Sequence, residues 1–90
     1  MIIDEIGKAA ALEQLAEEAT ELAQAALKYA RKLRGENPTP KTLEEIKANL
    51  IEEFTDVTIC ADVLGLHHDW IMKEQKIKRW QERIHNEHCN

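Results

Sequence analysis

Hydrophobic residues recur at helical spacing along most of the chain, and no segment shows the alternation typical of a β-strand. Between Asp4 and Arg34, good helix formers fill nearly every position, and the only glycine is Gly7. Apolar residues in this segment recur every three or four positions, at Leu12, Leu15, Ala19, Leu22, Ala26, Tyr29 and Leu33. A period of about 3.5 residues is that of a seam between helices. The pattern therefore predicts one long helix over residues 4–34 that packs against another helix at a shallow angle.

Turn and capping residues mark where this helix ends and where the next one begins. Gly35 follows three cations in four positions, an arrangement that favours a helix C-terminus. Two prolines then predict a connecting loop over residues 36–41. Thr42 followed by Glu45 matches a capping box, which predicts that the second helix begins there.

Two further helices follow from the same kind of evidence. The second carries apolar residues that we expect to point inward, namely Ile46, Leu50, Phe54, Val57, Ala61 and Leu64. It should end near Gly65. The third is expected to begin at Asp69, a favourable N-cap, and to run through Ile77, Trp80 and Ile84 toward the C-terminus.

These elements predict an all-α fold in which a long antiparallel helical pair is joined by a third, C-terminal helix. At 90 residues the chain is expected to form a single domain, residues 1–90. A helix of about 30 residues is ~45 Å long, whereas a compact domain of this size has a radius of gyration of only ~12 Å. The long helix therefore overhangs its own domain. We expect a homo-oligomer, a dimer or tetramer, to cover the excess apolar seam and complete a helical bundle.

Charge and composition exclude several classes of protein. The chain has 12 Lys and Arg against 17 Asp and Glu, a net charge of −5, which argues against binding to nucleic acid polymers or anionic membranes. No apolar run reaches the ~18 residues of a membrane span. The N-terminus lacks the basic and apolar regions of a signal peptide, so we expect a cytoplasmic protein. Cys60 and Cys89 form no CxxC pair and are expected to be reduced thiols.

An acidic motif occurs once on each of the first two helices. Residues 17–22 read EEATEL and residues 52–57 read EEFTDV. In each copy an acidic pair borders the apolar seam on the same side of its helix, Glu18 with Glu21 and Glu53 with Asp56. A short loop makes the two helices antiparallel, so these four carboxylates are expected to converge.

Convergent carboxylates require a cation. Two like charges about 4 Å apart repel by ~1 kcal/mol in water and by ~4 kcal/mol at an effective dielectric constant of 20. Oxygen ligands without His or Cys suit hard cations, and Mg²⁺ binds a few carboxylates while it keeps waters and substrate phosphates as its other ligands. The motif therefore predicts a Mg²⁺ site, in which Mn²⁺ could substitute, for a phosphate ester.

The third helix carries positive charge that complements this cluster. Lys73, Lys76, Arg79 and Arg83 form a stripe beside the apolar residues of the helix, here called the basic stripe. Residues 1–68 contain 7 basic and 13 acidic side chains, whereas residues 69–90 contain 5 and 4. The basic stripe is a candidate for binding substrate phosphates, since Arg makes bidentate phosphate contacts. The alternative is that these cations pair with acids such as Glu74 and Glu82.

Together these residues resemble the MazG-type all-α nucleoside triphosphate pyrophosphohydrolases. The resemblance covers about Leu12 to Arg83 and rests on Glu17-Glu18-x-x-Glu21, on Glu53-x-x-Asp56 and on the basic run at residues 76–79. It implies Mg²⁺-dependent hydrolysis of a nucleoside triphosphate between the α- and β-phosphates, which gives monophosphate and pyrophosphate.

The resemblance also implies roles for individual residues. Metal ligands would be Glu18, Glu21, Glu53 and Asp56, and phosphates would be bound by Lys76 and Arg79, in a dimer or tetramer. One carboxylate is then available as a general base, although the sequence does not identify which one. The catalytic candidates are Glu53 and Glu17, the latter in an outer-shell role. The chain departs from the family pattern in the longer gap between Glu21 and Glu53, in Asn49 where a lysine is often found, and in Trp80 where an arginine is often found.

Three other interpretations remain open. Four histidines and two cysteines invite a zinc site, but neighbouring histidines are adjacent or three apart, the latter pair near a chain end, whereas helical zinc sites favour ligands at i and i+4. Glu82-x-x-His85 is half of a di-iron carboxylate motif, which would need a second copy from another chain. The third is a non-catalytic helical interaction module, in which the acidic pairs only flank a dimer seam.

Overall fold

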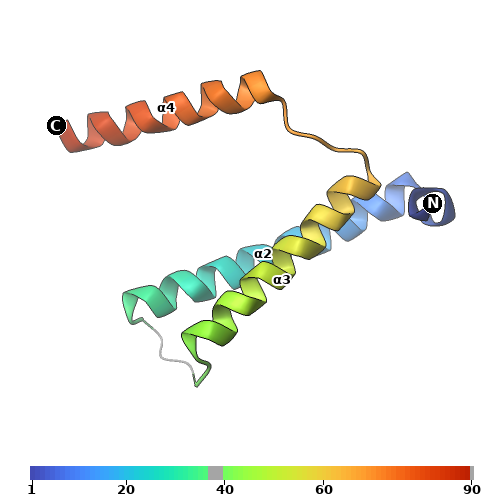
Figure 1. Cartoon of the computed structure of the whole chain (residues 1–90), viewed down its shortest axis with the longest axis horizontal. Helices are drawn as coiled ribbons and strands as arrows, with labels where there is room; N and C mark the ends of the chain where they lie inside the picture. The colour runs from blue at the N-terminus through green and yellow to red at the C-terminus, as the bar shows by residue number, and fades with distance from the viewer. Residues whose placement is uncertain (37–39, 90) are drawn as a thin grey trace.

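The described residues form four helices in an all-α fold, one helix more than the three that the sequence predicts. The computed structural model describes residues 1–36 and 40–89. In chain order the helices are α1 (Ile2–Ile6), α2 (Lys8–Arg34), α3 (Leu43–Val63) and α4 (Trp70–Cys89) (Figure 1). Across the described residues there is no strand, and no helix is both long and apolar enough to cross a membrane. The expected loop over residues 36–41 lies partly outside the described residues, which omit 37–39.

The long helix expected over residues 4–34 is interrupted near its start. Gly7 separates α1 from α2, with φ 85° and ψ 159°. Residues with a side chain almost never adopt this conformation, whereas glycine adopts it without a steric penalty. The chain changes direction there, so that α1 folds against the first turns of α2. The helix predicted over residues 4–34 is therefore two helices, which are joined at Gly7.

The other helix ends follow the capping residues in the sequence. The hydroxyl oxygen of Thr42 accepts a hydrogen bond from the backbone N–H of Glu45 at 3.1 Å, and Asp69 Oδ1 accepts one from the N–H of Met72 at 3.0 Å. Gly35 ends α2 in the left-handed conformation at φ 73°. These contacts satisfy backbone groups that a helix leaves without an intrahelical partner.

The core lies between α2 and α3, which run antiparallel and pack along their length (Figure 1). Residues 30–32, near the end of α2, are half-buried. Before them, the buried and half-buried positions of α2 are spaced four and three residues apart, at Ala11, Leu15, Glu18, Leu22, Ala25 and Tyr29. This contact stripe shares only half of its positions with the predicted seam. Ala19 and Leu33 of that seam are exposed, and so is Phe54 of α3, at 57 %. One helix covers only part of a wide apolar face, and the rest of that face faces solvent.

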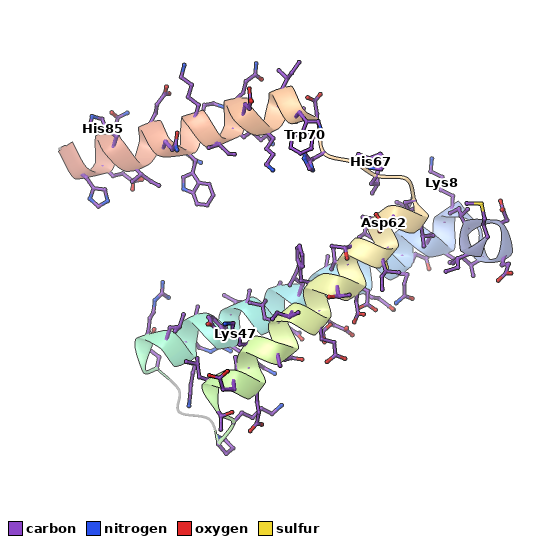
Figure 2. All side chains as sticks on the ribbon, in the orientation of Figure 1. Lys8, Lys47, Asp62, His67, Trp70 and His85 are labelled. Carbon is purple, nitrogen blue, oxygen red and sulfur yellow. The ribbon has the colours of Figure 1, made fainter. Side chains whose placement is uncertain are left out.

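Helix α4 is separate from the α2–α3 pair. After Gly65, residues 66–69 are non-helical and lead the chain away from α3 (Figure 1). Side chains of α4 project into open space along the helix, from Trp70 at its start to His85 near its end (Figure 2). The Cα radius of gyration is 17.1 Å, against about 12 Å for a compact chain of this length. Trp80 is 61 % exposed although it belongs to the predicted apolar stripe.

The Thr42 cap gives a direct test of how α3 begins. We expect Thr42→Ala to lower the free energy of unfolding by about 1 kcal/mol, because one backbone N–H loses its partner. Thr42→Ser keeps the hydroxyl and should retain most of the stability. Urea unfolding followed by circular dichroism measures both variants, and equal midpoints for the alanine variant and the parent chain would contradict the cap.

Candidate functional site

Three of the four predicted carboxylates meet in the contact between α2 and α3. Glu18 comes from α2, and Glu53 and Asp56 come from α3. Each of the three side chains is half-buried, and one oxygen from each lies within 4.8 Å of the others. We call these three residues the carboxylate cluster. Because Glu18 and Glu53 both lie on the contact stripes of their helices, the helical packing itself brings their charges together.

The cluster has negative charge that the surrounding chain leaves uncompensated. Glu18 Oε2 and Glu53 Oε2 are shielded from solvent, and neither accepts a hydrogen bond from a described residue. Among the described residues, the side-chain hydrogen bond to the cluster comes from α2 itself, where Gln14 Nε2 donates to Glu18 Oε1 at 2.8 Å. Shielded carboxylate oxygens without partners are costly, and repulsion between neighbouring carboxylates adds to the cost. A bound cation would relieve both.

The other predicted acidic residues lie outside this cluster. Glu21 follows Glu18 by one turn but is exposed, and it is not among the three residues whose oxygens converge. Glu17 is also exposed, as expected for a residue next to the contact stripe rather than on it. Three oxygen ligands from the chain leave several positions of an octahedral Mg²⁺ open for water or phosphate oxygens.

Two residues near the cluster were not identified from the sequence. Gln14 precedes Glu18 by one turn, and Cys60 follows Asp56 by one turn. The pKa of the Cys60 thiol is raised above its ordinary value, first by burial and then by the negative charges of Glu18 and Asp56. Gln14 is four residues from Glu18, and Cys60 is four residues from Asp56. This spacing places each side chain on the same face of its helix as the acid, and it is the sequence signal that could have identified both residues.

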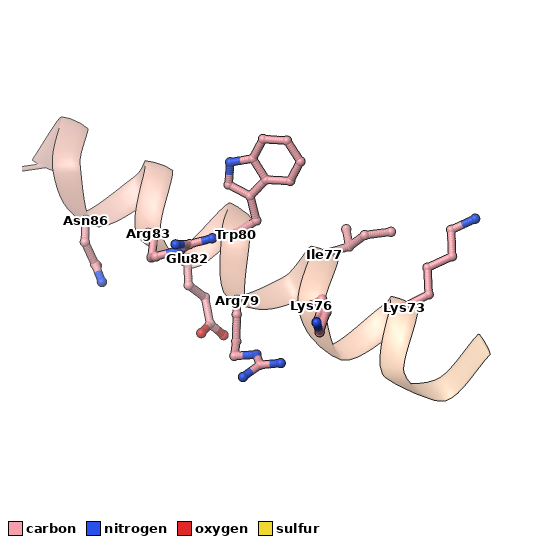
Figure 3. A pocket seen from close by; sticks show the side chains of 8 residues that line it. All are labelled: Lys73, Lys76, Ile77, Arg79, Trp80, Glu82, Arg83 and Asn86. Atoms are coloured by element: carbon pink, nitrogen blue, oxygen red, sulfur yellow. The ribbon is translucent and has the colours of Figure 1, made fainter. Parts of the chain in front are cut away.

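The basic stripe lies on α4, away from the carboxylate cluster. Its four residues line an open hollow along the helix together with Ile77, Trp80, Glu82 and Asn86 (Figure 3). In that view Ile77 and Trp80 lie on one side of the helix and Arg79 and Glu82 on the other. Every lining residue belongs to α4, so a single chain does not bring these cations to the cluster.

The cations of the basic stripe have few partners of their own. Lys73 Nζ lies 5.0 Å from the centroid of the Trp70 ring, a cation–π contact. In the described parts of α4, Lys73, Lys76, Arg79 and Arg83 form no ion pair with Glu74 or Glu82. Intrahelical pairing therefore does not account for the stripe.

The arrangement gives no support to the zinc and di-iron alternatives. Among the described residues, the only group of three metal-ligating side chains is the carboxylate cluster, which contains no histidine. The ring of His68 packs edge-on against Trp70, with ring centroids 4.2 Å apart. Glu82 and His85 lie on α4, away from the acidic residues of α2 and α3.

Comparison with known proteins found no match to a family model, to a curated protein or to a solved structure. The similarity to MazG-type enzymes therefore stays a prediction based on the motifs. What the structure adds is the convergence of Glu18, Glu53 and Asp56.

Repulsion within the cluster can be measured without any ligand. We expect Glu53→Gln to raise the thermal midpoint in EDTA, because it removes one of three close charges. A gain of about 1 kcal/mol corresponds to ~4–8 °C for a domain of this size. Glu52→Gln changes an exposed neighbour on the same helix and is the matched control. Equal midpoints for the two variants would show that the cluster is not strained by its charge.

The raised pKa of Cys60 predicts a slow thiol. In a Cys89→Ser chain, the alkylation rate should reach half of its plateau at a pH above the ordinary thiol value of 9.0. The unfolded chain loses the thiol proton near pH 9.0, whereas the folded chain keeps it to higher pH. The free energy of unfolding should therefore fall as the pH rises above 9.0. Glu18→Gln should move the alkylation profile to lower pH, whereas Glu17→Gln should not. Identical profiles for the two variants would exclude the charge of Glu18 as a cause.

Proposed function

We propose that the protein is a Mg²⁺-dependent nucleoside triphosphate pyrophosphohydrolase that releases pyrophosphate and a nucleoside monophosphate. The observation that carries this proposal is the carboxylate cluster, with two shielded oxygens that lack hydrogen-bond partners. An all-oxygen donor set on two rigid helices suits a hard divalent cation. The motif resemblance described above supplies the reaction, and nucleotide-pool clean-up is the role that it suggests.

The proposed chemistry assigns a task to each part of the site. Glu18, Glu53 and Asp56 would hold Mg²⁺, and the exposed Glu21 would supply a fourth ligand after a change of rotamer. When bound, the cation polarises the phosphoryl group and lowers the pKa of a coordinated water. Glu53 accepts a proton from the attacking water, and Glu17 orients it from the outer shell. This step breaks the bond between the α-phosphorus and the bridging oxygen, and the leaving pyrophosphate keeps that oxygen.

The phosphates also need cations, which the proposal takes from α4. Lys76 and Arg79, with Lys73 and Arg83 beside them, would bind the triphosphate once α4 lies against an α2–α3 pair. The exposed apolar face of α4 and the exposed part of the α2 seam support assembly with further copies of the chain. We therefore propose a homo-oligomer, a dimer or tetramer, in which the cationic and acidic parts of the site come together.

The same exposed faces favour one other function, that of a non-catalytic helical interaction module. Trp70, Ile71 and Trp80 are all more than 60 % exposed, an unusual arrangement for an isolated chain. In that case the carboxylates would only flank a protein interface. The two proposals differ in whether triphosphate hydrolysis depends on the cluster.

Hydrolysis by purified protein separates the two functions. With Mg²⁺ and a panel of nucleoside triphosphates, we expect Asp56→Asn to lower pyrophosphate release at least ~100-fold, since it removes a metal ligand. Asp62→Asn, an exposed aspartate on the same helix, is the matched control and should keep full activity. The enzyme hypothesis fails if both variants release pyrophosphate at the rate of the parent chain.

Assembly is tested by the mass in solution. Light scattering should give at least twice the chain mass of 10.4 kDa, because an assembly covers the exposed apolar faces. Trp80→Glu places a charge on the apolar side of α4 and should lower the mass. A single-chain mass for the parent protein at working concentration would contradict the homo-oligomer.

A further inference from the structure

An apolar cavity of about 130 Å³ lies where α1, α2 and α3 meet. All three helices contribute to its wall, which consists of Ile2, Ile6, Ala11, Gln14, Ile59, Cys60 and Val63. The cavity exists because Gly7 turns α1 back against α2 rather than letting one helix continue. Ile2, Ile6 and Ile59 are each about half exposed at its edge, so apolar surface is left for a ligand to cover.

This cavity is next to the carboxylate cluster. Gln14, in its wall, donates a hydrogen bond to Glu18 Oε1 at 2.8 Å. On the facing helix Cys60, also in the wall, follows Asp56 by one turn. One turn is ~5.4 Å along a helix axis. A ligand with charged groups at the cluster therefore has an apolar, half-open space about one sugar ring away.

We propose that this cavity receives the base of the nucleotide whose phosphates lie at the carboxylate cluster. The inference rests on the proposed function and extends it, because it assigns the part of the site that distinguishes one substrate from another. Ligand pockets are usually 300–1,000 Å³. A space of about 130 Å³ is too small for a whole nucleotide but suits one flat ring system, with the ribose and phosphates outside.

The wall also fits a base by its chemistry. Isoleucine and valine side chains pack against the faces of a ring, and burial of that apolar area favours binding. Almost all of the wall surface is apolar. Gln14 is the one wall residue with a strong hydrogen-bonding group, and its amide is engaged with Glu18 rather than exposed in the cavity. Because Gln14 lines the cavity and binds Glu18, a base in the cavity and a cation at the cluster would act on the same side chain.

Binding of non-hydrolysable nucleotides tests the inference. The probes are the α,β-methylene analogues of ATP, GTP, CTP and UTP with Mg²⁺, and inorganic tripolyphosphate is the base-free reference. We expect at least one analogue to bind about ten-fold more tightly than tripolyphosphate, which is ~1.4 kcal/mol. Ile59→Trp should remove that advantage by filling the edge of the cavity. Ile51→Trp, another half-exposed isoleucine on α3 outside the cavity wall, should preserve it.

The outcomes separate this inference from the proposed function. If the analogues and tripolyphosphate bind equally, or if Ile59→Trp and Ile51→Trp behave alike, the cavity does not hold the base although the phosphate site stands. If neither kind of probe binds with Mg²⁺, the proposed function fails.

A second measurement needs no phosphate site. Uncharged nucleosides at millimolar concentration should slow alkylation of Cys60 in the Cys89→Ser chain, because a base in the cavity covers this thiol. Tripolyphosphate should leave the rate unchanged. Circular dichroism confirms that each variant is folded. An unchanged alkylation rate with all nucleosides overturns the inference. That result is also expected if a side chain from another copy of the chain already fills the cavity, and the inference is wrong in that case too.

Discussion

Like charges held together inside the main helix–helix contact, between α2 and α3, are the constraint on which this molecule depends. In most helical pairs the contact stripe is apolar throughout, but here Glu18 and Glu53 occupy it and Asp56 lies beside them. The apolar core that opposes their repulsion is small, since Ala11, Ala25 and Ile46 are the only buried hydrophobic residues in the described parts of the chain. An ion that neutralises the cluster would therefore act on the stability of the fold and on its chemistry together.

The same small core explains why so much apolar surface stays uncovered. Two helices can cover only one side of each other, and α4 covers neither of them. A chain of this size is marginal without a metal, a disulfide or a partner. The exposed seam of α2 and the apolar side of α4 are surfaces of the kind that partner helices cover. Assembly and cation binding would therefore both compensate for the low stability of a small apolar core, and the proposed function involves both.

Local signals in the sequence were enough for the helix ends other than the break at Gly7. Thr42, Asp69 and Gly35 each form the cap that their residue type predicts, because capping depends on groups a few positions away. The convergence of Glu18 with Glu53 also followed from short-range rules, namely a repeated motif and an antiparallel connection.

Features that depend on conformation or on long-range packing were not predictable in this way. Gly7 reads as a tolerated residue inside a helix, and its left-handed conformation shows only in three dimensions. The period of the apolar residues predicts a seam on α2. Which side of that seam contacts α3 depends on the packing of the two helices, and here the contact includes Glu18 and leaves Ala19 exposed. Cys60 and Gln14 have no motif of their own. Their importance comes from the cavity and the charges that the fold places beside them.

The central claim is that the carboxylate cluster binds a divalent cation, and crystallography with manganese tests it most directly. Mn²⁺ has the same preference for oxygen ligands as Mg²⁺ and gives an anomalous signal. Crystals grown with Mn²⁺ should show an anomalous peak between the carboxylates of Glu18, Glu53 and Asp56. A fully occupied manganese peak elsewhere on the protein, with none at these three residues, would contradict the account.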